Sequence, residues 1–277
     1  MIVDARSRPP IPAFLPDRTY QNLERTLADS RRRGWTPSAS ITGRDLDAYL
    51  ADVRAGAIER VGIPARVPNR WWGGQGNDLV FAACAEHPDL CYPYAAVDPS
   101  APGAADEVAG LVARGARGVV VEPGICDEPR YVDDPEFDGL YGACAELGVP
   151  VLLMGGGETG PDLSFSDPLR FERVAIRFPR LQLVNVHGGW PLTQAALGVA
   201  YRRPNVWLLA DVYFPGLPGE QDYLLAIRTF LAERFLFATG YPFCPVAEIL
   251  QRYRSFGLAP DVFANVMGGN AQRLFRL

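Results

Sequence analysis

Three side chains that suit proton transfer or charge stabilisation each follow a short apolar run. His187 follows LQLVNV, Glu122 follows GVVV, and Asp211 follows VWLLA. Histidine moves protons near neutral pH because its unperturbed pKa is about 6.5, and a carboxylate can orient a histidine ring. We therefore predict His187, Asp211 and Glu122 as catalytic residues. A structural hydrogen bond is the alternative role for His187, and charge balancing is the alternative for the two carboxylates.

Two arginines, Arg6 and Arg8, lie two residues apart in the opening run IVDARSR. On a strand this spacing places both side chains on the same side. A guanidinium buried without a partner is costly, so the pair needs anions. A substrate carboxylate or phosphate fits, because arginine grips such groups with two parallel hydrogen bonds. Internal carboxylates such as Asp4, Glu122 or Asp211 fit as well, and would make the pair a structural salt-bridge network.

Four aromatic residues lie next to these runs or in a glycine-rich segment. Tyr213 and Tyr241 follow two of the apolar runs and could donate hydrogen bonds to a ligand, Trp190 closes the motif HGGW, and Trp72 belongs to WWGGQGN. Tryptophans beside flexible glycines suit an apolar wall over a planar ligand. We predict all four as substrate-binding residues, with ordinary packing as the alternative.

Composition excludes several kinds of chemistry. All 27 basic residues are arginine, so a lysine Schiff base, a lysine-bound pyridoxal phosphate and a P-loop lysine are impossible. Only His87 and His187 are present, so a zinc site would need thiolates or carboxylates to complete it. The five cysteines are odd in number and lack CxxC spacing, which argues against a disulfide framework or a zinc ribbon.

The net charge and the hydropathy of the chain restrict the classes of binding partner and the cellular location that we expect. The net charge of −5 gives no basic footprint for nucleic acid. No apolar run reaches the 18 or so residues of a membrane span. The opening segment MIVDARSRPP lacks the apolar region of a signal peptide. We therefore expect a cytoplasmic protein with a small-molecule partner, and neither nucleic acid nor membrane.

Apolar and amphipathic stretches alternate along the chain. The predicted strands are 1–6, 58–63, 90–97, 117–122, 150–154, 181–187, 206–211 and 235–239. The predicted helices are 45–54, 77–87, 104–114, 135–147, 167–178, 193–202, 220–233 and 245–256, with one or two closing helices in 261–277. Eight such units predict an α/β fold, a single (β/α)8 TIM barrel over residues 1–277. Residues 9–44 are interpreted as a long loop insertion after the first strand, with a short helix near 18–33.

Motifs along nearly the whole chain are similar to those of a known family. They are IVDARSRPP, AEHPDLCYPYAAVDP, ELGVPVLLMGG, LQLVNVHGGWP, RPNVWLLADVY, RFLFATGYPF and MGGNAQRLFRL. In this order they resemble the amidohydrolase-related family that includes aminocarboxymuconate-semialdehyde decarboxylase, resorcylate decarboxylases and pyrone-dicarboxylate lactonase. The resemblance implies a metal-dependent type of barrel. It also implies a homodimer in which an arginine of the neighbouring subunit completes the site, although the sequence itself shows no oligomer.

The sequence differs from the family at the positions of the metal ligands. The family's two first-strand histidines fall at Arg6 and Arg8, its strand-five histidine at Met154, and its strand-eight aspartate at Gly240. His187 matches the strand-six histidine, which lies beside the metal and serves as acid or base. The resemblance therefore implies a family site without its metal ligands, and we expect no metal and no cofactor.

These features predict a metal-independent acid–base enzyme acting on a small carboxylated substrate, aromatic or unsaturated. Hydrolysis of an ester or lactone and decarboxylation both fit. A catalytically inactive barrel that binds a ligand or protein partner is the alternative from another class. A third hypothesis is a metalloenzyme with the rearranged ligands His187, Asp211, Glu122 and Cys244.

Overall fold

A curled sheet of parallel strands forms the centre of the molecule in the computed structural model, which describes residues 1–277. Its strands are β1 (Ile2–Asp4), β2 (Ile58–Pro64), β3 (Cys91–Ala96), β4 (Val119–Val121), β5 (Val151–Met154), β6 (Leu183–Val186) and β7 (Val206–Leu209). Each strand pairs in parallel with the next one along the chain, from β1 to β7. Sequential parallel pairing of this kind is the arrangement of a TIM barrel.

Residues 235–239 close the barrel between β7 and β1, where the sequence predicts an eighth strand. Leu236 donates a backbone hydrogen bond to Leu208 at 2.9 Å, and Ala5 donates one to Phe237 at 3.0 Å. The only strand-type pairing here is an isolated parallel bridge between Leu208 and Phe235. The prediction of a regular eighth strand is therefore wrong in detail, because the segment bonds to both neighbours without forming a continuous ladder.

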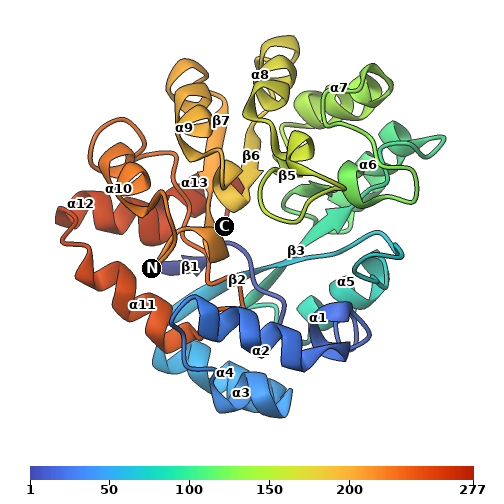
Figure 1. Ribbon diagram of the computed structural model, residues 1–277. Helices are drawn as coiled ribbons and strands as arrows, with labels where there is room; N and C mark the ends of the chain where they lie inside the picture. The colour runs from blue at the N-terminus through green and yellow to red at the C-terminus, as the bar shows by residue number, and fades with distance from the viewer.

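Helices surround the strands as a ring (Figure 1). They are α1 (Arg18–Gln21), α2 (Leu23–Arg32), α3 (Ala39–Gly43), α4 (Leu46–Ala55), α5 (Asn77–Glu86), α6 (Ala104–Ala113), α7 (Asp138–Leu147), α8 (Pro168–Arg177), α9 (Thr193–Arg202), α10 (Glu220–Arg228), α11 (Val246–Ser255), α12 (Pro260–Ala264) and α13 (Asn270–Phe275). Short 3-10 turns are η1 (Pro123–Ile125), η2 (Pro135–Phe137), η3 (Leu163–Ser166), η4 (His187–Gly189) and η5 (Asp211–Tyr213), and a π-helical turn, η6, spans Asn265–Gly269.

The eight predicted crossover helices all form, within a few residues of the predicted bounds except for α10, which ends five residues early. The two closing helices also form, joined by the π-helical turn. In residues 9–44 the helix predicted near 18–33 forms as α1 and α2, whereas α3 was not predicted and makes the connection more helical than expected. Asn22 separates the first two of these helices, and its side chain caps α2 by accepting a hydrogen bond from Arg25.

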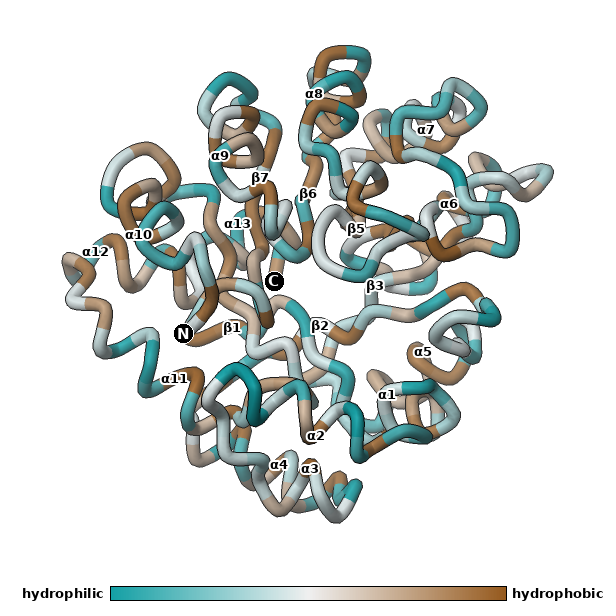
Figure 2. The backbone as a smooth tube through the Cα atoms, viewed as in Figure 1, coloured by the Kyte–Doolittle hydropathy of each residue, from teal (hydrophilic) through white to brown (hydrophobic).

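Strands β4, β5 and β7 contain only apolar residues, because helices cover their outer face while side chains fill the barrel. Strands β4, β5, β6 and β7 are buried at every residue, as expected for parallel strands with both faces covered. Figure 2 shows hydrophobic colour along β6 and β7 and hydrophilic colour on many of the outer turns. No helix is both long enough and apolar enough to cross a membrane.

Candidate active site

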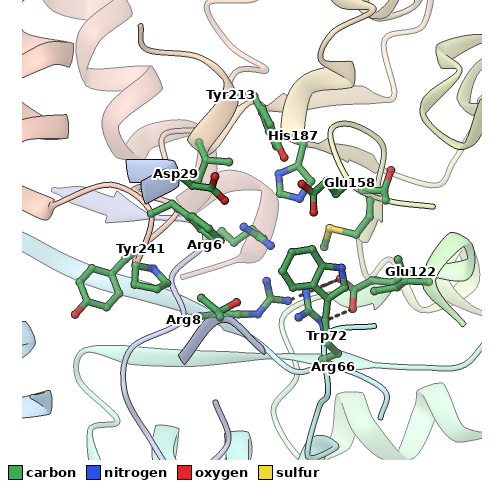
Figure 3. A pocket seen from close by; sticks show the side chains of 18 of the residues that line it. Arg6, Arg8, Asp29, Arg66, Trp72, Glu122, Glu158, His187, Tyr213 and Tyr241 are labelled. Carbon is green, nitrogen blue, oxygen red and sulfur yellow. Dashed lines mark hydrogen bonds and ion pairs between the residues drawn. The ribbon is translucent and has the colours of Figure 1, made fainter. Parts of the chain in front are cut away.

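One pocket lies at the carboxyl ends of the strands, the end at which TIM barrels carry their active sites. Its empty volume, including the open mouth, is about 760 Å³. The titratable side chains that line it, most of them labelled in Figure 3, come from six separate parts of the chain: Arg6, Arg8, Asp29, Arg33, Arg66, Glu122, Glu158 and His187. The pocket therefore brings together the predicted His187, Arg6, Arg8 and Glu122, which span 181 residues of sequence.

His187 and Asp211 form a hydrogen-bonded pair at the ends of neighbouring strands. The Nδ1 atom of His187 lies 2.8 Å from the Oδ1 atom of Asp211, whose Oδ2 atom accepts a hydrogen bond of 2.8 Å from Nη1 of Arg6. Asp211 is fully buried, whereas 13% of the His187 side chain is exposed. Because Nδ1 is engaged, Nε2 is the ring nitrogen left to act on a ligand.

Both members of the pair have left-handed backbones. The φ angle is +69° at His187 and +32° at Asp211. Side chains other than glycine adopt such angles at a cost of about 1–3 kcal/mol, and residues of this kind cluster at functional sites. Val212 fixes the carboxylate further by donating its backbone N–H to Oδ1 of Asp211 at 2.7 Å. The chain thus holds the pair in one orientation at the expense of local strain.

The charges around this pair favour a neutral imidazole on an ionised carboxylate. Burial lowers the pKa of His187, and Arg6 and Arg8 lower it further, which together outweigh the opposite effect of Asp211. Burial raises the pKa of Asp211, but His187 and Arg6 bring it below its usual range. With a proton on Nδ1, the neutral ring presents Nε2 as a base.

We expect the imidazole of His187 to titrate below the ordinary histidine pKa of about 6.5. Proton–carbon NMR of the imidazole rings measures this directly, because the chain has only two histidines. The variant His87→Gln assigns the two signals. Asp211→Asn should move the midpoint still lower, since it removes the carboxylate that favours the protonated ring. A midpoint above 6.5 in the native protein would contradict this electrostatic picture.

Glu122 serves mainly as the partner of Arg66. Nε and Nη2 of Arg66 donate to the two Glu122 oxygens at 3.1 and 3.2 Å. Burial raises the pKa of Glu122, but Arg66 and Arg8 together bring it below its usual range. A carboxylate held this firmly in its ionised form is a weak base. Of the two roles predicted for Glu122, the geometry supports charge balancing.

Arg8 is the least satisfied cation of the pocket. Its side chain is 8% exposed, and its nearest carboxylate oxygen, on Glu122, is 3.9 Å from Nη2. Neither Nε nor Nη2 of Arg8 has a hydrogen-bond partner. Burial lowers the pKa of Arg8 well below its usual range, and the neighbouring Arg66 and Arg6 add to this effect. A buried guanidinium in this state favours an incoming anion.

Aromatic rings form the walls near His187. Tyr213 meets the His187 ring edge-on at 5.2 Å and stacks on Trp190 at 5.1 Å, with 14° between the planes. Trp190 supports Tyr213 from behind and does not itself line the pocket. Trp72 lines the pocket and lies 5.8 Å from the Arg66 guanidinium carbon. Tyr213 and Trp72 thus line the pocket, Trp190 contacts it only through Tyr213, and the role of all three in substrate binding stays a prediction.

Tyr241 is a correction to the predicted binding residues. Although it belongs to the pocket wall, its ring turns away from the charged side chains (Figure 3). It packs against Tyr49 with ring centroids 4.6 Å apart. Its hydroxyl is therefore not placed to donate to a ligand in the pocket. A residue that follows a strand can face outward, and the sequence pattern does not distinguish the two directions.

Several pocket residues were not predicted from the sequence. They are Thr19, Asp29, Arg33, Arg66, Ile125, Glu158, Thr159, Val212, Pro242 and Phe243. Arg66 had a usable signal, because it follows β2 by two residues just as Asp211 follows β7. Asp29 and Arg33 come from α2 and its end, within the short helix predicted near 18–33, and they carried no signal of this kind.

The four positions that the resemblance assigns to metal ligands do converge. Arg6, Arg8, Met154 and Gly240 all line the pocket together with His187. However, two guanidiniums repel a divalent cation, and a glycine has no ligand atom. No group of three or more histidine, cysteine, aspartate or glutamate side chains is arranged to hold a metal ion. The side chains present therefore do not fit the family's metal.

The backbone and the surroundings of Gly240 leave no room for a side chain at this position. Its φ angle is +62°, and a Cβ atom there would lie 2.3 Å from Cγ1 of Val212. We expect Gly240→Asp to destabilise the fold by about 2–4 kcal/mol, from backbone strain and overpacking. Gly257 has a φ of +61° and open space around it, so Gly257→Asp measures the strain alone. Urea unfolding should show the larger loss for Gly240→Asp, and equal losses would contradict the clash.

Comparisons with known proteins agree with this architecture. A family model described as Amidohydrolase matches residues 4–277. An uncharacterised TIM-barrel protein of Bordetella bronchiseptica superposes with a TM-score of 0.95 at 34% identity, covering 99% of this chain and 98% of that one. The gamma-resorcylate decarboxylase of Rhizobium sp. (strain MTP-10005) is 22% identical over 310 residues, covering 95% of this chain and 92% of its own.

A third similar protein was solved with a metal. The dihydroxybenzoic acid decarboxylase of Polaromonas sp. JS666, with bound manganese and the inhibitor 2-nitroresorcinol, superposes with a TM-score of 0.67 at 19% identity. The superposition covers 92% of this chain and 94% of that one, and at this identity it shows a shared fold. Because the family model spans nearly the whole sequence, the chain belongs to the amidohydrolase family.

Proposed function

We propose that this protein is an acid–base enzyme that hydrolyses an ester or lactone of a small carboxylated, aromatic or unsaturated substrate without a catalytic metal. The observation that carries the proposal is Arg8, a buried guanidinium without a hydrogen-bonded partner that faces the same pocket as the free Nε2 of His187. An anionic group on Arg8 would relieve its unfavourable burial and would place the rest of the substrate beside the imidazole.

His187 acts as the base in this proposal. Its Nε2 takes a proton from a water molecule while the water oxygen attacks the carbonyl carbon. Asp211 holds the ring through Nδ1 and stabilises the imidazolium that forms. Nε of Arg6 has no partner in the pocket and is a donor for the oxyanion of the tetrahedral intermediate. When the carbon–oxygen bond breaks, the imidazolium returns its proton to the leaving alcohol or enol.

Decarboxylation is the second candidate, and the names of the relatives favour it. The curated relatives are gamma-resorcylate decarboxylases. In this reaction His187 would supply a proton to the carbon that loses carbon dioxide. The lowered pKa of His187 favours the neutral ring at neutral pH, so the form that can accept a proton predominates over the form that can donate one. For this reason we place hydrolysis first.

Activity on matched substrates tests the proposal. Purified protein, treated with a chelator and checked by elemental analysis, is assayed with carboxylated aryl esters and lactones, with their uncharged analogues, and with dihydroxybenzoates. The proposal predicts hydrolysis of the carboxylated esters or lactones and weaker hydrolysis of the uncharged ones. Release of carbon dioxide from the dihydroxybenzoates would select the second candidate. Activity only after manganese is added would overturn the metal-free mechanism, and no activity in any assay would favour a barrel that only binds its ligand.

A further inference from the structure

A second arginine whose guanidinium makes no hydrogen bond to a carboxylate lies in the same pocket. Arg33 directly follows α2 and is partly exposed. Its guanidinium carbon is 5.4 Å from the ring centroid of Tyr213 and 5.7 Å from that of Phe243. Both rings line the pocket. Because Tyr213 is itself stacked on Trp190, the guanidinium is held in place by aromatic contacts rather than by a salt bridge.

The nearest carboxylate is occupied by other arginines. Asp29, one turn earlier on α2, pairs with Arg25 and Arg32. Arg33 reaches only the backbone carbonyl oxygen of Asp29, at 3.5 Å. Glu158, another acidic residue of the wall, is bound by Arg25 at 2.6 and 2.8 Å. The acidic groups at this part of the pocket are therefore neutralised, whereas Arg33 forms no ion pair.

The pocket thus has two guanidiniums at different depths that form no hydrogen bond to a carboxylate: Arg8, which only approaches Glu122 to 3.9 Å, and Arg33. Arg8 is buried and Arg33 is partly exposed, and Arg6 and Arg66 are already paired with Asp211 and Glu122. Arginine held in a fixed orientation is well suited to a carboxylate, because few rotamers are lost when the hydrogen bonds form. A substrate with a single carboxylate would leave one of the two cations unused.

We propose that Arg33 is a second anion subsite and that the substrate is a small aromatic or unsaturated dicarboxylate. One carboxylate binds Arg8, and the other binds Arg33 between the rings of Tyr213 and Phe243. This inference rests on the proposed function in that it takes Arg8 as the first anion site. It adds the number of charges on the substrate and a specificity-determining residue outside the barrel strands.

Isothermal titration calorimetry with benzoate and the three benzenedicarboxylates, 1,2-, 1,3- and 1,4-, tests the inference. At least one dicarboxylate should bind about tenfold more tightly than benzoate. A second charged contact worth about 1.4 kcal/mol gives a difference of this size. Arg33→Gln should remove this preference and leave benzoate affinity unchanged. Arg31→Gln, an exposed residue of the same helix outside the pocket, should behave as the native protein.

The outcomes separate this inference from the proposed function. If Arg8→Gln weakens every ligand but no dicarboxylate is preferred, or if Arg33→Gln leaves the preference intact, the second subsite is disproved and the Arg8 site stands. If Arg8→Gln changes no affinity, the first anion site fails, and the dicarboxylate assignment fails with it. Arg33→Gln could also weaken the binding of benzoate and of the dicarboxylate by the same factor. That result would show that Arg33 binds the carboxylate that both ligands share, and it would overturn the dicarboxylate assignment.

Discussion

Replacement of His187 by glutamine is expected to lower kcat by a factor of about 10²–10⁴, the usual contribution of a general base. Glutamine preserves much of the side-chain volume and can still contact Asp211, but it cannot take a proton from water. KM should change little, because the anion-binding arginines stay in place. Steady-state kinetics on a hydrolysed substrate gives both constants.

His87→Gln is the matched control for this variant. His87 follows α5 and does not line the pocket, so the same substitution there should leave kcat and KM unchanged. Circular dichroism and urea unfolding confirm that both variants fold. Retention of native kcat by His187→Gln would show that His187 is a structural residue, which was the alternative role predicted for it from the sequence.

Replacement of Arg8 by glutamine is expected to raise KM about 100-fold, equivalent to roughly 2.7 kcal/mol from two lost charged hydrogen bonds. The reduction in kcat should be smaller, because the carboxylate is bound in both the ground state and the transition state. Arg8→Lys should recover only part of the loss, since an ammonium cannot form the two parallel hydrogen bonds of a guanidinium.

The stability of the same variant distinguishes a ligand site from a structural brace. The buried guanidinium of Arg8 has no hydrogen-bond partner at Nε or Nη2, so removing its charge relieves an unfavourable burial. We expect Arg8→Gln to keep or increase the free energy of unfolding in urea. Arg117→Gln, an exposed arginine just before β4, provides the baseline for a surface position. A large loss of stability in Arg8→Gln alone would indicate the internal salt-bridge network instead.

The sequence was most informative about the barrel because each unit repeats the same physical pattern. Strand β5 is a run of buried apolar residues, and Gly148, at a φ of +63°, ends the helix before it. Such local signals predicted the eight crossover helices. They could not predict that residues 235–239 would bond to both neighbouring strands without a regular ladder, because that depends on how the barrel closes.

The candidate site was predictable where a residue has a local signal in the sequence. His187 directly follows a strand, Arg6 and Arg8 are two residues apart in the opening run, and the structure places all three in one pocket. The direction of Tyr241 depends on its packing against Tyr49, which no local pattern records. The position of Arg33 in the pocket could not be predicted for a similar reason, because it depends on how α2 packs across the barrel mouth.

The electrostatic roles of the two carboxylates could not be predicted from the sequence either. Glu122 and Asp211 each follow a strand and looked equivalent as carboxylates. In the structure Asp211 binds the imidazole of His187 and Glu122 binds the guanidinium of Arg66. The partner decides the chemistry: a carboxylate on an imidazole supports proton transfer, whereas a carboxylate on a guanidinium balances charge.

A crystal structure grown with benzoate, without added metal, and accompanied by elemental analysis of the same protein tests the central claim most directly. We predict a carboxylate bound by Arg8, the aromatic ring beside His187, and no transition metal in the sample. A metal ion on Nε2 of His187, with Arg6 and Arg8 displaced from the pocket, would contradict the metal-free mechanism.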